Sequence, residues 1–298
     1  MKNLISIIIR TYNEEKYLEE LLISINKQKL SKFKIETIII DSGSTDSTTD
    51  IAKKYQVRLT YIDKKNFSFG RSLNLGCKFS KGEILVFISG HCVPTNSLWL
   101  SRLINPILNG FEYSYGKQIG RDTTKLSEMQ VFAKQYPNTS SIPQENFFCN
   151  NANAAISRKI WKKYKFNEDI TGCEDMELAK RYFNDGGKIA YISSAIVFHI
   201  HNEDWTSIRR RYERESIALQ IIMPEINLKF TNAIYYFIVA IIKDYKFALK
   251  KNIFFKNFYS ISRYRFEQYF GSYIGNHFSR KLSERKKIEY FYPRNIKN

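Results

Sequence analysis

Runs of apolar residues alternate with helix-spaced stretches along the first 90 residues. Leu4 to Ile9 is an apolar, β-branched run, as expected of a strand covered on both faces. Glu14 to Gln28 carries its apolar residues at helical spacing, and a second β-branched run, Ile35 to Ile40, follows. The pattern then repeats, with helices expected at Thr45–Tyr55 and Arg71–Phe79 and strands at Val57–Ile62 and Ile84–Ile88. The alternation predicts an α/β fold with a mostly parallel sheet, right-handed crossovers and flanking helices.

The pattern becomes less regular after about residue 110. Strands are expected at Tyr113–Ile119 and Lys188–Phe198, and helices at Glu174–Phe183 and Trp205–Ile222. The polar stretch Thr123–Gln144 is typical of a mobile loop.

Length and composition predict a globular protein with one main domain and an extension. The chain has 298 residues, of which 43% are hydrophobic and 26% charged. We place the main domain at residues 1–223 and a helical, basic and aromatic extension at 224–298. The four cysteines show no C-x-x-C spacing, and residues 1–9 lack the features of a signal peptide. These features favour reduced thiols and a cytoplasmic location.

The positive charge is concentrated in the extension. The net charge is +18, and residues 224–298 hold 15 Lys and Arg against 5 Asp and Glu. Asn232–Ile242 is almost wholly apolar, but an eleven-residue helix spans only about 16 Å of a hydrocarbon core of roughly 30 Å. Lysines and aromatic residues follow it. The pattern favours an interfacial helix on anionic lipid at the inner face of the cell membrane, and the alternative is a helix packed on the main domain.

Polar residues follow three of the expected strands, at the edge where parallel sheets bind ligands. They are Thr11-Tyr12-Asn13-Glu14, Asp41-Ser42-Gly43-Ser44-Thr45-Asp46 and Ser89-Gly90-His91-Cys92. The second segment is equally well explained as a capped turn without a ligand. Arg71 is expected at a helix N-terminus, where a guanidinium and backbone amides can hold phosphate, although a surface arginine explains it as well.

Two further groups of residues carry candidate chemistry. Glu174 and Asp175 open an expected helix, where a carboxylate can act as a general base or can simply complement the helix dipole. His199 and His201 alternate at a strand end, and the basic run Arg209-Arg210-Arg211 follows. This second group indicates a phosphate or metal site, or a structural pair of histidines.

In their order and spacing these motifs resemble glycosyltransferase family 2, a large inverting family with the GT-A fold. The resemblance covers roughly residues 3–215 and is clearest in Ser6–Glu14, Ile40–Asp46 and Lys81–Phe87. It implies a nucleotide-sugar donor and a glycan or lipid-linked glycan acceptor, as in the synthesis of capsule, O-antigen or a similar surface polysaccharide. It also implies site residues: nucleotide contacts at Thr11, Tyr12, Glu14 and Asp41, a diphosphate contact at Arg71, and the base at Asp175 beside Glu174.

One motif departs from the family. Where members usually have Asp-x-Asp, which binds a divalent metal and the donor phosphates, this chain has Ser89-Gly90-His91. A Mn²⁺ or Mg²⁺ cofactor is therefore in doubt. Either His91 and His199 bind a metal, or His91 as imidazolium neutralises the leaving phosphate without one, an alternative that the residue types favour slightly. We assign His201, Arg209 and Arg210 to a phosphate or to the acceptor.

Two other functions compete with this interpretation. Charge and aromatic content also suit a nucleic-acid-binding protein, but no recognition motif supports one, and we expect no nucleic-acid partner. The missing acids are compatible with an inactive scaffold of the same fold. The presence of Asp41, Arg71 and Glu174-Asp175 argues against that alternative.

Overall fold

The computed structural model describes residues 3–277 of the chain. They form two compact units that interleave in sequence. Of the described residues, unit 1 comprises 3–119, 136–169 and 174–200, and unit 2 comprises 120–135, 170–173 and 201–277.

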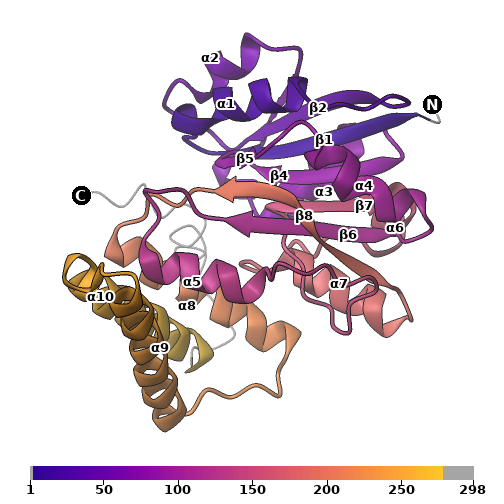
Figure 1. Cartoon of the computed structure of the whole chain (residues 1–298). Helices are drawn as coiled ribbons and strands as arrows, with labels where there is room; N and C mark the ends of the chain where they lie inside the picture. Colours follow the sequence, from indigo (N-terminus) through magenta and orange to yellow (C-terminus); the bar gives the residue numbers. More distant parts are fainter. Residues whose placement is uncertain (1–2, 278–298) are drawn as a thin grey trace. The chain divides into compact units, whose positions relative to one another are not determined.

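The first half of unit 1 is the expected series of strands and helices (Figure 1). Four neighbouring strands are parallel, so their carboxyl ends lie along one edge of the sheet. Each helix after a strand brings the chain back to start the next strand. The elements are β1 (Leu4–Thr11), α1 (Glu15–Asn26), β2 (Lys34–Asp41), α2 (Thr48–Lys53), β3 (Arg58–Tyr61), η1 (Lys64–Asn66), α3 (Phe69–Phe79) and β4 (Ile84–Ser89).

The second half of unit 1 extends the sheet with mixed pairing. β4 pairs antiparallel with β7 (Asn153–Ser157), and β7 pairs antiparallel with β6 (Tyr113–Ile119). β6 then pairs in parallel with β8 (Ile189–His199). The eight strands lie in the order β3-β2-β1-β4-β7-β6-β8-β5. The added elements are β5 (Cys92–Pro94), α4 (Trp99–Leu108), β6 (Tyr113–Ile119), β7 (Asn153–Ser157), α6 (Arg158–Tyr164), α7 (Glu174–Asn184) and β8 (Ile189–His199).

The core of unit 1 explains why the β-branched runs form central strands. Ile5, Ile7 and Ile9 of β1 are fully buried, and Leu18 and Leu21 of α1 belong to the same cluster. Burial of each such side chain is worth about 1.5–3 kcal/mol. The apolar residues therefore hold the backbone of β1 in place, and with it the polar residues that follow.

Unit 2 consists of helices, and one of them corrects the sequence analysis. Part of the stretch expected to be a mobile loop, Thr123–Gln144, is a helix, because Leu126 and Phe132 are buried despite their polar neighbours. Short helices take most of their stability from such packing, which a local pattern shows poorly. The helices are α5 (Leu126–Gln135), α8 (Trp205–Ile222), α9 (Phe230–Lys250) and α10 (Phe254–His277).

Glycine allows two helices of unit 2 to approach closely. A Cβ atom added at Gly271 of α10 would lie 2.5 Å from the carbonyl oxygen of Arg209, and one at Gly275 would lie 2.3 Å from that of Glu213. Both carbonyls belong to α8. Substitution of either glycine would push α10 away from α8.

The apolar segment Asn232–Ile242 lies within α9, which is longer than the segment alone. Within residues 3–277, no helix is both long and apolar enough to cross a membrane.

Candidate active site

The polar residues of unit 1 gather where the parallel strands end. Thr11 of β1 is in register with Asp41 of β2, and Arg10 is in register with Ser89 of β4. The three segments that the sequence singled out after these strands therefore lie at one edge of the sheet, as expected.

Asp41 organises the turn after β2. Its buried carboxylate accepts hydrogen bonds from Thr11 Oγ1 at 2.9 Å, from Ser44 Oγ at 2.6 Å and from the backbone N–H groups of Gly43 and Ser44. Asn13 Oδ1 accepts a further bond from the N–H of Thr45 at 2.8 Å. These bonds hold the chain after β1 against the chain after β2, so Asp41 shapes this edge of the sheet.

Tyr12 and Glu14 extend the same edge. Lys64 Nζ lies 3.2 Å from the Tyr12 hydroxyl and 4.9 Å from the centre of its ring. Glu14 is buried, and its carboxylate lies 2.8 Å from His91 Nδ1. Gly90 allows this approach, because an added Cβ would lie 2.9 Å from Glu14 Cγ.

Arg71 lies in the first turn of α3, as expected. The N-cap residue Ser68 accepts a hydrogen bond from the N–H of Arg71. The guanidinium donates to Glu168 Oε2 at 2.9 Å and to the carbonyl of Asn66 at 2.7 Å. Although partial burial opposes its ionisation, hydrogen bonds from Asn74 and Arg71 lower the pKa of Glu168. Arg71 is therefore positioned by an ion pair, with its side chain 42% exposed.

Asp175 has the environment of a general base. It lies in the first turn of α7, where its carboxylate accepts hydrogen bonds from the backbone N–H groups of Asn151 at 2.7 Å and Met176 at 2.8 Å. Burial, followed by the charge of Glu174, raises the pKa of Asp175 to about 7. Glu174 is itself paired with Arg10 NH1 at 3.1 Å. A carboxylate that titrates near neutral pH is suited to accept a proton.

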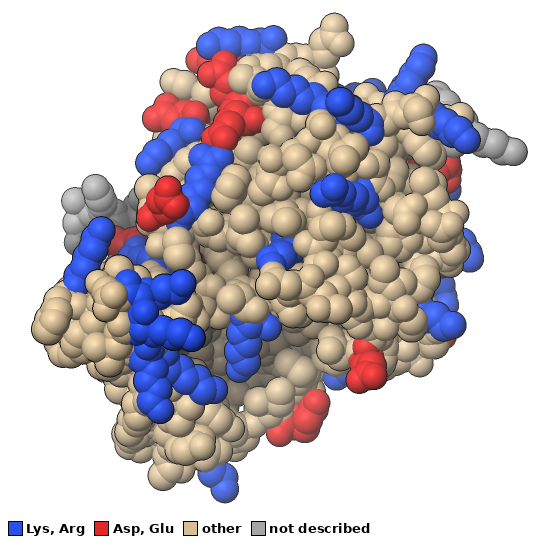
Figure 2. Space-filling model, viewed as in Figure 1, with Lys and Arg blue, Asp and Glu red and all other residues tan. Residues whose placement is uncertain are grey.

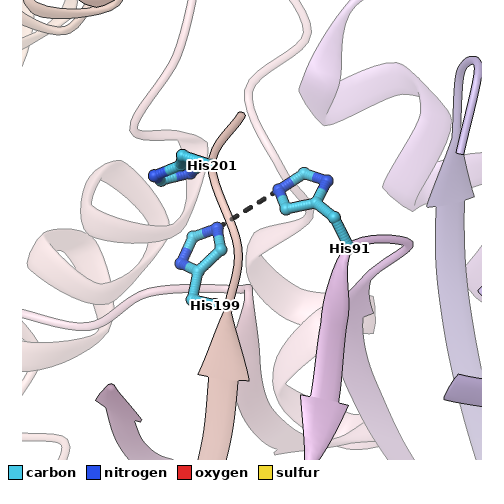
Figure 3. Close-up of side chains that lie close together, drawn as sticks. All are labelled: His91, His199 and His201. Atoms are coloured by element: carbon cyan, nitrogen blue, oxygen red, sulfur yellow. Dashed lines mark hydrogen bonds between the residues drawn. The ribbon is translucent and has the colours of Figure 1, made fainter. Parts of the chain in front are cut away.

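His91 directly precedes β5, and His199 is the last residue of β8, the strand that pairs with β5. Their side chains face each other (Figure 3). Their Nε2 atoms lie 3.2 Å apart. On the outer sides, His91 Nδ1 lies 2.8 Å from Glu14 Oε1 and His199 Nδ1 lies 2.6 Å from Gln118 Oε1. A hydrogen on Nδ1 of each neutral ring would donate to the oxygen on its outer side. Both Nε2 lone pairs then point at one another, an arrangement that is favourable when a cation lies between them.

The remaining predicted residues lie in unit 2, where His201 and Arg209 make ion pairs. His201 Nδ1 lies 2.8 Å from Glu128 Oε1, and Arg209 binds Glu267 through Nε and NH2. Arg210 is half-buried in α8. Although burial opposes its ionisation, the charges of His201 and Arg211 lower the pKa of Glu128 to about 2.

Sequence reasoning missed four residues that position the site. Arg10, Gln118, Asn151 and Glu168 contact predicted residues from distant segments. Arg10 alone had a sequence signal, as a charge at the end of an apolar strand. The contacts of the other three exist only once the sheet is assembled.

Comparison with known families gives a match over the first half of the chain. The model of "Glycosyl transferase family 2" matches residues 6–165, which is 160 of the 298 residues. The chain is 26% identical to the O-antigen chain rhamnosyltransferase RfbN of Salmonella typhimurium over 214 residues, which cover 66% of this chain and 67% of RfbN.

Solved structures of similar fold include two glycosyltransferases with bound nucleotide sugars. The mannosyltransferase PcManGT from Pyrobaculum calidifontis, in complex with GDP-Man and Mn²⁺, has a TM-score of 0.64 and 15% identity, covering 99% of this chain and 89% of that one. S. aureus TarS 1–349 with UDP-GlcNAc has a TM-score of 0.52 and 20% identity, covering 77% and 68%. At these identities the likeness concerns the fold alone.

Proposed function

Since the chain belongs to glycosyl transferase family 2, we propose that it transfers a sugar, with inversion, from a nucleotide-sugar donor to a glycan or lipid-linked glycan of a surface polysaccharide. The similarity to an O-antigen rhamnosyltransferase supports this acceptor class. The observation that carries the proposal is Asp175, a buried carboxylate held by two backbone N–H groups, with its pKa raised to about 7.

In the proposed reaction an acceptor hydroxyl oxygen attacks the anomeric carbon of the donor sugar. The bond from that carbon to the diphosphate oxygen breaks, and the nucleoside diphosphate leaves with the bonding electrons. Asp175 takes the proton of the attacking hydroxyl, which makes the oxygen a stronger nucleophile. Glu174 raises the proton affinity of Asp175 through its charge, and Arg10 binds Glu174.

The donor is assigned to the edge where β1, β2 and β4 end. Thr11, Tyr12, Glu14 and Asp41 are the proposed nucleotide contacts, and Asp41 also holds the turn after β2. Arg71, positioned by Glu168, is the proposed diphosphate contact. His201, Arg209 and Arg210 stay assigned to a phosphate or the acceptor, with residues 1–223 as the catalytic domain.

The histidine pair fits a transition-metal ion better than magnesium. Two imidazole nitrogens bound to one tetrahedral ion at about 2.0–2.1 Å lie about 3.3 Å apart, close to the 3.2 Å between His91 and His199. Glu14 and Gln118 hold the outer nitrogens, as partners of metal-bound histidines do. Imidazole suits later transition metals, whereas Mg²⁺ prefers oxygen. We therefore propose that His91 and His199 hold such an ion, which would supply positive charge beside the donor phosphates. The alternative to a metal ion is a proton shared between the two Nε2 atoms.

We further propose that the protein works at the inner face of the cell membrane, attached through residues 224–298. The excess of Lys and Arg in this segment supports attachment to anionic lipid, and a lipid-linked acceptor would be presented there.

The test of the proposed function is Asp175→Asn. Asparagine keeps the size of the side chain but cannot take the proton, so we expect transfer to fall at least about a hundredfold while donor binding is kept. In the wild-type protein kcat/KM should rise with pH and level off above about 7, because the base must be deprotonated. Initial rates with a panel of UDP-, GDP-, dTDP- and CMP-sugars measure both, after a thermal-shift screen identifies the donor.

Asp50→Asn is the matched control, because Asp50 is exposed and pairs with Lys53 on the surface. An Asp175→Asn variant that keeps more than about a tenth of the wild-type kcat would remove Asp175 from the role of base.

A further inference from the structure

The helix α9 turns its small and polar residues inward. Ala233, Ala240 and Ala248 are buried, and so is Asp244. Arg265 of α10 donates to both oxygens of Asp244, at 2.8 and 2.9 Å. These contacts fix which side of α9 faces the rest of unit 2.

Another side of α9 carries large apolar residues that remain exposed. Phe230, Ile234, Ile238 and Ile242 are 60%, 42%, 47% and 45% exposed. Residues four apart are displaced by only about 40° around a helix, so the four side chains form one continuous stripe. Helices on the surface of globular proteins show the reverse pattern, with the apolar stripe inward. We call this stripe the α9 face.

Every exposed charge among residues 229–259 is positive. Between residues 229 and 259 the only acid is Asp244, which is buried against Arg265. Phe255, which is 94% exposed, lies between lysines where α10 begins. Figure 2 shows Lys and Arg side chains gathered over the part of the chain that contains α9 and α10. The exposed lysines are Lys229, Lys243, Lys246, Lys250, Lys251 and Lys256.

The apolar stripe and the lysines together indicate which kind of partner would bind the α9 face. An anionic lipid surface offers hydrocarbon for the stripe and phosphate for the lysines of the same segment. A second copy of the chain docked through the same face would set lysines against lysines, and a nucleic acid would leave the isoleucines in water. Within residues 3–277 no helix can span a bilayer, so the fitting geometry is a helix lying in the interface.

We infer that the α9 face is a docking surface for anionic lipid, with α9 lying in the plane of the membrane and Phe255 inserted beside it. This inference rests on the proposed attachment through residues 224–298 and identifies the side chains responsible. It assigns hydrocarbon contact to Ile234, Ile238 and Ile242, and headgroup contact to the lysines.

The experiment compares two double variants of equal charge in the full-length protein. Ile234→Glu/Ile242→Glu alters the α9 face. Tyr236→Glu/Phe247→Glu is the control, because both residues are exposed on another side of the same helix. Each protein is sedimented with two kinds of vesicle, one of phosphatidylcholine alone and one of phosphatidylcholine with about 30% phosphatidylserine. We expect the first variant to lose at least about tenfold in partition onto the anionic vesicles, and the control to lose threefold or less.

Three readouts separate the explanations. Equal loss in both variants would show that charge alone mediates binding and would overturn the inference. A dimeric wild type that becomes monomeric in the α9-face variant, with unchanged vesicle binding, would assign the face to a second copy. Thermal unfolding and donor hydrolysis should match the wild type in both variants, and a failure of hydrolysis in the wild type itself would count against the proposed function alone.

Discussion

At the residue scale, the carboxylates that the sequence singles out are used in different ways. Asp41 receives four hydrogen bonds from its own turn and from Thr11, so it holds the turn after β2 in place. Asp175 receives two, and burial beside Glu174 raises its pKa to about 7. Both residues look alike in sequence, as acids at the start of a turn or helix.

The histidine pair allows a prediction at the same scale. Cobalt(II) added to EDTA-treated protein should give visible absorption bands, because imidazole ligation is favoured by later transition metals. His91→Ala and His199→Ala should each weaken cobalt binding by about tenfold or more, and magnesium should not restore activity after EDTA. Optical titration measures the binding directly, independently of turnover.

His277→Ala provides the control, since His277 is an exposed histidine of α10. Cobalt binding that is equal in wild type and His91→Ala, together with full activity in EDTA, would show that the pair holds a proton instead.

At the scale of elements, unit 2 depends on polar contacts that no periodicity reveals. Ser127 of α5, Asp244 of α9 and Arg265 of α10 meet in one buried network, with Ser127 Oγ donating to Asp244 Oδ2 at 2.6 Å. The network joins three helices that are far apart in sequence. It also explains why α9 keeps a charged residue in the middle of an apolar stretch.

We expect Asp244→Ala to destabilise unit 2 by about 3–5 kcal/mol, because it leaves the buried guanidinium of Arg265 unpaired. Unfolding followed by the fluorescence of Trp205, which lies in α8, measures the change. Adding Arg265→Met should restore part of the loss, since no charge then remains unpaired. Asp50→Ala, which breaks an exposed pair with Lys53, should cost less than about 1 kcal/mol. Equal costs for the two single variants would contradict the importance of the network.

At the scale of the whole molecule, net charge and exposed apolar surface favour the same partner. The charge of +18 is concentrated in residues 224–298, and the α9 face lies in that segment. Charge acts over about 10 Å at 0.1 M salt and about 3 Å at 1 M, whereas apolar burial is not screened.

Binding of the full chain to anionic vesicles should therefore fall at least about tenfold when NaCl is raised from about 0.05 to about 0.5 M. A smaller, salt-resistant component of binding should remain. The α9-face variant should lose the salt-resistant part, and the control variant should keep it. Sedimentation across the salt series measures both components. Binding that does not change with salt would show that the lysines make no contact with lipid headgroups.

The sequence by itself determined the alternating strands and helices and the edge of the sheet that carries the candidate site, and it proposed Asp41, Arg71 and Asp175 as site residues. These features depend on local periodicity and on residues close to strand ends, which a single chain displays directly. It also showed the loss of the acidic motif at Ser89-Gly90-His91.

Only the tertiary structure decided what depends on residues far apart in the chain. The pairing of His91 with His199 spans 108 positions, and the bond from Asn151 to Asp175 spans 24. Helix α5 is stabilised by burial of Leu126 and Phe132, which its own sequence pattern did not reveal. The direction of the apolar side of α9 was likewise set by Asp244 and Arg265. Periodicity identifies an apolar stripe, but the contacts on the other side of the helix decide whether that stripe faces the core or the solvent.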